Sequence, residues 1–126
     1  MSVQETCTAS VATGALSATT TVYLAHGQPG EWSLTGITLV PQAATTADGS
    51  HKYVIAFTQG SDTVATSHDT SATALVAGTA QAMTVTTTAG AAAEFGATDA
   101  ITVVCTETGT ATMSAVIVAA FERVRV

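Results

Sequence analysis

Apolar and polar residues alternate along many short segments of this chain, which is the pattern of β-strands with one buried face. The clearest segment is 31–40, in which Ile37 and Leu39 share one face, and 52–58 follows with Tyr53, Ile55 and Phe57 on one face. Similar but weaker patterns predict strands at 19–25, 63–67, 73–76, 81–87, 101–106 and 111–126.

Turn-forming residues separate these segments. The loop 26–30 contains Gly27, Pro29 and Gly30, and Asp48-Gly49 is a strong signal for a tight turn. Residues 59–62 turn the chain, and 107–110 is typical of a hairpin turn. Gly36, in the middle of the clearest strand, indicates a bulge or bend. Residues 89–100 are expected to form a loop or a single helical turn, with Phe95 plugging the core.

About eight short strands with turns between them suit an antiparallel sandwich or barrel, and no segment shows a sustained helical period. We therefore predict an all-β fold, an antiparallel two-sheet sandwich that is jelly-roll-like. The chain length of 126 residues fits one domain. We expect residues 1–20 to form an extended N-terminal arm or edge strand, and residues 21–126 to form the single sandwich domain.

Alanine and threonine supply 25 and 26 of the 126 residues, so large apolar side chains are scarce. Threonine and valine branch at Cβ and favour strands. The core is therefore expected to be thin, and contacts with neighbouring subunits are expected to add stability.

The net charge is −6, and Lys52, Arg123 and Arg125 are the only lysines and arginines. A nucleic-acid interface needs a larger basic footprint, and an anionic membrane surface is disfavoured for the same reason. The N-terminus lacks the features of a signal peptide, and the longest apolar run, 115–121, is too short to cross a bilayer. The chain has no asparagine, which excludes N-glycosylation. We expect folding in a cytoplasm, without secretion.

The titratable residues form no recognisable motif. His26, His51 and His68 are expected in exposed loops, without the spacing of zinc ligands. Asp48 and Asp62 are expected to serve turns. Ser67, His68 and Asp69 are consecutive, but adjacency does not make a triad. The sequence therefore predicts no enzyme, no metal and no cofactor.

Cys7 and Cys105 each alternate with apolar neighbours, so both are expected to face inward from terminal strands. We interpret them as two small buried apolar side chains. The alternative is a disulfide closing a long loop, which the expected reducing compartment disfavours.

Three residues are candidates for contact with another subunit: Trp32, Arg123 and Arg125. Trp32 lies beside a loop and suits a core or interface anchor better than a sugar-binding platform. Arg123 and Arg125 share one face of the last strand. They either guard a sheet edge in solvent or pair with acids of a neighbour.

Two stretches together resemble small β-sandwich or jelly-roll virion proteins of tailed bacteriophages, especially capsid decoration (cement) proteins. One runs from Gly30-Glu31-Trp32 to Pro41 and on through Ala47-Asp48-Gly49 to Tyr53, and the other runs from residues 96–103 to 121–126. The resemblance implies homo-oligomers, with a trimer favoured, that sit on the capsid exterior and bridge major capsid proteins or other virion subunits. It implies no catalytic residues.

We therefore expect a structural virion protein, assembled in the host cytoplasm, that stabilises a capsid mechanically. The alternative is a head- or tail-fibre component or a glycan-binding sandwich module, for which Trp32 and Tyr53 would be exposed together in a groove.

Overall fold

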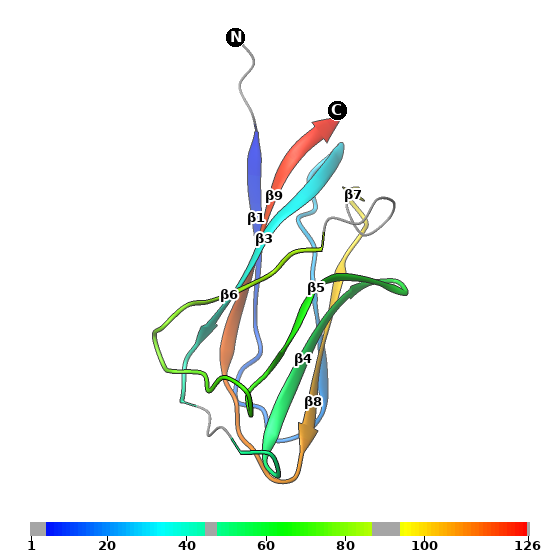
Figure 1. Ribbon diagram of the computed structural model, residues 1–126. Helices are drawn as coiled ribbons and strands as arrows, with labels where there is room; N and C mark the ends of the chain where they lie inside the picture. Colours follow the sequence, from blue (N-terminus) through cyan, green and yellow to red (C-terminus); the bar gives the residue numbers. More distant parts are fainter. Residues whose placement is uncertain (1–4, 45–47, 87–93, 126) are drawn as a thin grey trace.

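The computed structural model describes residues 5–44, 48–86 and 94–125, and these ranges contain nine β-strands and no helix (Figure 1). They accordingly hold no helix with the length and apolar character to span a bilayer. The strands are β1 (Thr6–Ala12), β2 (Thr20–Leu24), β3 (Glu31–Pro41), β4 (Lys52–Gln59), β5 (Asp62–Asp69), β6 (Gln81–Met83), β7 (Glu94–Phe95), β8 (Ile101–Thr108) and β9 (Ala115–Arg125).

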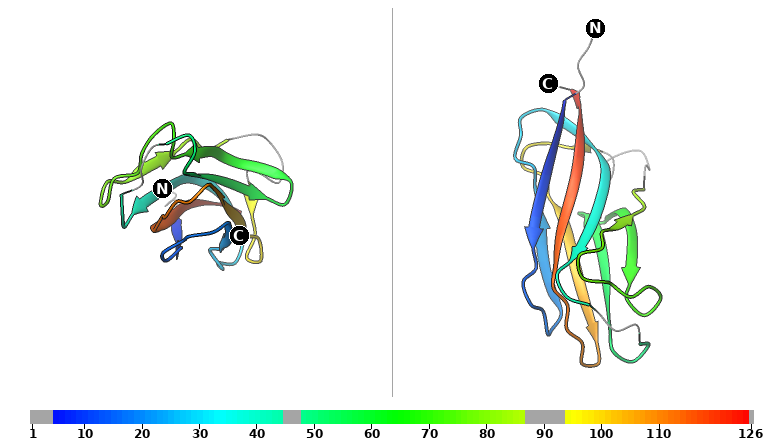
Figure 2. Two further views of the ribbon diagram at one scale, coloured as in Figure 1. Left: turned by 90° about the horizontal axis from the view of Figure 1, so that it is seen from below. Right: turned by 90° about the vertical axis from the view of Figure 1, so that its left-hand side faces the viewer.

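The strands form two antiparallel sheets, which Figure 2 shows as two curved layers. The first sheet has the order β1-β9-β3-β6, with β7 also paired with β3, and the second has the order β2-β8-β4-β5. The pairs are nested, because β1 pairs with β9, β2 with β8, β3 with β6 and β7, and β4 with β5. This is the wiring of a jelly roll, and the predicted fold class is confirmed.

The core lies between the two sheets and follows the alternation of the strands. Ile37 and Leu39 of β3 are at most 1% exposed, as are Tyr53, Ile55 and Phe57 of β4. Phe95 is 1% exposed and lies opposite Trp32, so its predicted plugging of the core is confirmed. The bulge predicted at Gly36 is also confirmed, as a register shift between Leu34 and Gly36 in the pairing of β3 with β9.

A strand that changes sheets closes one side of the sandwich. β6 pairs with Ile37–Leu39 in the first sheet. The chain then bonds to β5 in the second sheet, where the Thr66 N–H donates to the Thr84 carbonyl (2.8 Å) and the Thr86 N–H donates to the Val64 carbonyl (2.9 Å). Strands that switch sheets are the usual way to build such a corner. The opposite side of the sandwich is bordered by the edge strands β1 and β2.

Two local predictions are wrong, and the loop or helical turn expected over 89–100 is wrong where Glu94–Phe95 form β7, while 89–93 lie outside the described residues. Residues 73–76 do not form a strand, because the Asp69 carbonyl accepts from the N–H groups of Ala72 and Thr73 and so continues a turn into this segment. Only Leu75 of that segment reaches the core, at 2% exposed. Residues 107–110 are not a hairpin turn, because β8 and β9 belong to different sheets and the segment crosses between them.

Gly109 follows β8 in this crossing and has a φ of 67°, in the left-handed region that favours glycine. A Cβ at this position would run into the Ser50 backbone carbonyl, in the turn that precedes β4. The Asp48-Gly49 turn itself is confirmed, since the Ser50 N–H donates to Asp48 Oδ1 (2.7 Å). Gly109 therefore allows the two connections at this end of the sandwich to lie in contact.

We predict that Gly109→Ala destabilises the protein more than Gly60→Ala does. Gly60, in the β4–β5 turn, has a similar φ of 60°, but a Cβ there would meet nothing within 4 Å. The control should lose about 1–2 kcal/mol for the left-handed conformation alone. Gly109→Ala should lose at least about 1 kcal/mol more, because backbone must move. Urea unfolding measures both, and equal losses would contradict the contact.

Candidate functional site

Trp32, the first predicted contact residue, lies inside the sandwich near the start of β3. Its side chain is 3% exposed, and the indole N–H donates to the Pro29 carbonyl (2.9 Å). Phe95 of β7 lies opposite Trp32 in the pairing of β7 with β3. Trp32 is therefore an anchor of the protein's own core, and it offers no surface to a second subunit in this chain.

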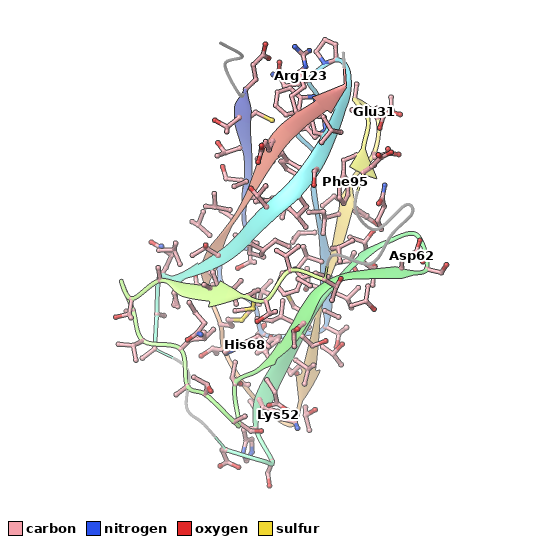
Figure 3. All side chains as sticks on the ribbon, turned by 45° about the horizontal axis from the view of Figure 1, so that its top comes forward. Glu31, Lys52, Asp62, His68, Phe95 and Arg123 are labelled. Carbon is pink, nitrogen blue, oxygen red and sulfur yellow. The ribbon has the colours of Figure 1, made fainter. Side chains whose placement is uncertain are left out.

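Arg123, the second predicted contact residue, joins three parts of the same chain. Its Nη1 donates to Glu5 Oε2 (2.9 Å), and its Nη2 donates to the Pro29 carbonyl (3.1 Å). The guanidinium carbon lies 5.2 Å from the centre of the Trp32 ring, in the geometry of a cation–π contact. Figure 3 shows Arg123 at the same end of the molecule as Glu31 and Phe95, with Lys52 at the opposite end.

The suggestion that this arginine guards a sheet edge is wrong. β9 lies between β1 and β3, so it is a central strand, and Glu5 of the same chain provides the acid. Arg125 ends β9 opposite Glu31. The side chain of Arg125 lies outside the described part of the chain.

The prediction that all three histidines are exposed is wrong for two of them. His26 and His68 are 8% and 7% exposed, whereas His51 is exposed and lies 3.5 Å from Asp48. His26 Nδ1 accepts from the Gln28 N–H (2.9 Å), which leaves Nε2 to donate to the Phe95 carbonyl (3.1 Å). His68 Nε2 bonds to the Thr73 carbonyl (3.0 Å). Both buried rings thus have backbone partners, which sequence spacing does not reveal.

Neither cysteine is bonded to the other. Cys105 is completely buried and Cys7 is partly buried, and both are free thiols. Burial raises the pKa of Cys105 to about 11 and also raises the pKa of Cys7. The interpretation as small apolar side chains therefore holds fully for Cys105 and partly for Cys7. Among the described residues, no three His, Cys, Asp or Glu side chains are grouped so that they could hold a metal ion.

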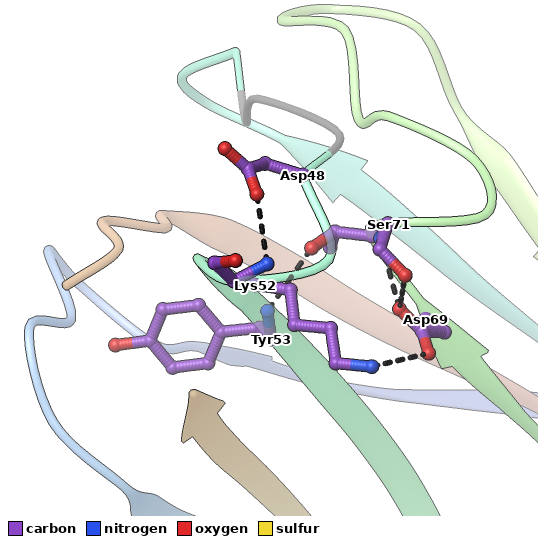
Figure 4. A network of polar contacts seen from close by, with 7 residues as sticks. Asp48, Lys52, Tyr53, Asp69 and Ser71 are labelled. Atoms are coloured by element: carbon purple, nitrogen blue, oxygen red, sulfur yellow. Dashed lines mark hydrogen bonds and ion pairs between the residues drawn. The ribbon is translucent and has the colours of Figure 1, made fainter. Parts of the chain in front are cut away.

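A polar network lies at the end of the second sheet that is far from Arg123 (Figure 4). The backbone N–H and the hydroxyl of Ser71 both donate to Asp69 Oδ1 (2.8 and 2.7 Å), and Lys52 Nζ donates to Asp69 Oδ2 (3.2 Å). These contacts, led by those of Ser71, lower the pKa of Asp69 to about 2. The Tyr53 N–H donates to Thr70 Oγ1 (3.0 Å), so the network fixes the turn after β5 against β4.

Tyr53 connects this end to the loop before β2. Its hydroxyl lies 3.2 Å from both the Ala18 carbonyl and Glu107 Oε2. Burial, followed by the hydrogen bond and charge of Glu107, raises the pKa of Tyr53 to about 12. Tyr53 and Trp32 are both buried, so they do not form the exposed pair that a glycan-binding groove requires. Tyr23, on the edge strand β2, is 63% exposed.

The outer face of the first sheet carries three consecutive rows of uncharged residues, which end at Glu122, the next outward residue of β9. Because Leu39, Ile117 and Ala119 point into the core, the residues between them point outward. The pairing aligns them in rows across β1, β9, β3 and β6, and we call this set the outer face: Ala12-Val116-Val40, Ser10-Val118-Thr38-Ala82 and Thr8-Ala120-Gly36. None of these ten residues is charged. The continuous apolar run from Ala115 to Phe121 in β9 is the sequence signal that would have indicated this face, because such a strand is apolar on both sides.

No family model, curated protein or solved structure matches this chain. The class of protein is therefore defined by strand pairing alone, as an all-β jelly-roll sandwich.

We predict that Arg123→Ala costs about 1–2 kcal/mol of stability and shifts the emission of Trp32, the only tryptophan. The variant loses the stacking on Trp32 and the bond to the Pro29 carbonyl. Glu5→Gln is the matched control. Because the Glu5 side chain is 56% exposed, its ion pair should contribute less than about 1 kcal/mol. Urea unfolding followed by fluorescence measures both, and equal losses would mean that the ion pair is the main contribution of Arg123.

We also predict a pH-dependent contribution from Asp69. Its pKa is lowered in the folded state, so its stabilising effect is present above the unfolded-state pKa near 4 and is lost as the pH falls through about 2. Asp69→Asn should therefore unfold at lower urea than the natural protein at pH 7, and the difference should shrink toward pH 2. Asp62→Asn removes the same charge outside this network and serves as the control. A difference between the natural protein and Asp69→Asn that does not change with pH would contradict the assignment.

Proposed function

We propose that this protein is a structural subunit that binds the exterior of a bacteriophage capsid, as a decoration protein in contact with the major capsid protein. Support comes from two independent directions. The sequence resembles such proteins over the stretches around Trp32 and around residues 96–126. The jelly-roll sandwich presents a broad outer face of small and β-branched residues.

The outer face is the single observation that carries the proposal. Val40, Val116 and Val118 are partly exposed at its centre, on the two longest strands of the fold. Removing such apolar surface from water contributes about 25 cal/mol per Å² before the costs of association are subtracted. Because these ten residues carry no charge, they can be covered without desolvating an ion, and Glu122 borders them in the next row. A surface of uncharged residues on paired strands suits permanent contact with another protein.

The proposed action is mechanical. The outer face lies on the same strands, β3 and β9, whose other side forms much of the core, so an attached subunit resists deformation of the surface beneath it. The trimer that the resemblance favours remains a prediction. The head- or tail-fibre alternative has the same structural support, but a glycan-binding module does not, since five of the six aromatic residues are buried and only Tyr23 is exposed.

Binding to purified capsids tests the proposal. We expect an antibody against the protein to detect it in purified particles of the phage that encodes it. Purified protein should rebind particles from which it has been removed. Val118→Asp should weaken rebinding about tenfold or more, because a charge would be buried in the contact. Thr106→Asp, an exposed substitution on β8 in the other sheet, should rebind normally.

Circular dichroism establishes that both variants are folded before rebinding is compared. Absence of the protein from purified particles would contradict the proposed function. Equal rebinding by the two variants would contradict the role of the outer face.

A further inference from the structure

The free edge of β1 is unusually open to another strand. Within the described part of the chain, β1 pairs with β9 and with no other strand. Its seven residues, Thr-Cys-Thr-Ala-Ser-Val-Ala, include no charge and no proline, and its register with β9 runs unbroken from Thr6 to Ala12. Proteins normally protect an edge strand with charges, proline, bulges or short length, and β1 has none of these protections.

The hydrogen bonds at its two ends define which groups face this open edge. The Arg123 N–H donates to the Glu5 carbonyl (2.9 Å), and the Thr13 N–H donates to the Ala115 carbonyl (2.9 Å). Bonding alternates along an antiparallel ladder, so the odd-numbered residues from 5 to 13 bond to β9. The even-numbered residues direct their backbone N–H and C=O groups away from β9: Thr6, Thr8, Ser10 and Ala12.

The other edges are shorter or covered. β6 has three residues, and the edge of β5 is bonded to residues 84 and 86. β2 has five residues and carries the large exposed ring of Tyr23. The side chains along the open edge of β1 are small by comparison, and those of its even-numbered residues are exposed. Among the described residues, β1 is therefore the longest edge strand whose outer side is neither bonded to other residues nor flanked by a large exposed side chain.

We propose that β1 pairs antiparallel with β1 of a second copy of this chain, about a twofold axis that passes beside Ala9. In this register Thr8 lies opposite Ser10 of the partner subunit, and Thr6 lies opposite Ala12 of the partner subunit. Every outward N–H and C=O of the four even-numbered residues then has a partner, and the two first sheets join into one continuous sheet. A register shifted by two residues leaves some of these groups unpaired.

The uncharged edge allows a second copy as the partner, and the position of Glu5 favours the antiparallel direction. Each chain carries −6, so two copies associate readily only where the contact itself is uncharged, as this edge is. Antiparallel pairing places Glu5 at opposite ends of the joined strands, opposite Thr13 of the partner subunit, whereas parallel pairing would place two Glu5 side chains together. It also brings Cys7, which is partly buried, opposite Val11 of the partner subunit, so that apolar surface is covered on the core side.

The inference does not depend on the proposed capsid function, since it concerns the free protein. It gives a twofold dimer as the unit of assembly, which differs from the trimer that the resemblance favours.

Sedimentation equilibrium over about 1–500 µM protein tests the pairing. We expect a dimer that is stabilised by added salt, because salt screens the repulsion between two acidic chains. The double variant Thr8→Asp/Ser10→Asp places like charges directly opposite each other twice, and it should weaken dimerisation about tenfold or more. The variant Thr8→Lys/Ser10→Asp places opposite charges in the same two positions and should restore it.

Thr106→Asp/Thr108→Asp is the matched control, because it adds two charges at exposed positions on β8 of the second sheet. It should dimerise like the natural protein, and circular dichroism should show all variants folded. A natural protein that stays monomeric throughout the concentration range would overturn the proposal. So would a trimer, or a dimer that the double-aspartate variant leaves unchanged. Equal weakening by both charged pairs would overturn the antiparallel register.

Discussion

The pairing of β3 with β9 is the interaction on which the rest of this fold depends. Both strands have 11 residues, and their register runs from Glu31 opposite Arg125 to Pro41 opposite Ala115. Each of the other strands of the first sheet is added to one side of this pair, β1 to β9, and β6 and β7 to β3. Since Pro41 and Ala115 are 74 residues apart in sequence and Glu31 and Arg125 are 94 apart, forming this pair brings the two halves of the chain together.

The nested wiring explains how a chain with few large apolar residues still encloses a core. Each crossing between the sheets places the apolar side of one strand against the apolar side of the other sheet. Both sheets therefore contribute buried residues: Ile55 and Phe57 from the second, and Ile37 and Leu39 from the first. Alanine and threonine supply several residues of the outer face, among them Thr8, Thr38 and Ala120. The same scarcity of large side chains that makes the core thin also leaves small, uncharged residues on the outer face of the first sheet, which supports contact with other subunits.

The two ends of the sandwich are held by polar contacts within the chain, made by partly exposed side chains. At one end Arg123 ties β9 to Glu5 and to the loop before β3, over the ring of Trp32. At the other end Asp69, Ser71 and Lys52 fix the turn after β5. In both places a charged side chain that looks available for a partner already has one in its own chain. The surfaces left for interaction are consequently the sheet face and the open edge.

Alternation, turn residues and the lack of helical periodicity were sufficient to predict strands, the sandwich class and the bulge at Gly36, because these depend on local spacing. The role of Phe95 was also predictable, since a lone large apolar residue in a stretch of small and polar residues is driven inward. By contrast, the burial of His26 and His68 and the internal pairing of Arg123 depend on carbonyls and acids that are distant in sequence. Residues 73–76 do not form the predicted strand, because the Asp69 carbonyl accepts hydrogen bonds from the N–H groups of Ala72 and Thr73 and continues the turn. The sequence by itself thus determined which segments are extended and which face of each is apolar. Only the tertiary structure decided which strands are neighbours, and therefore which polar groups are satisfied and which edge stays open.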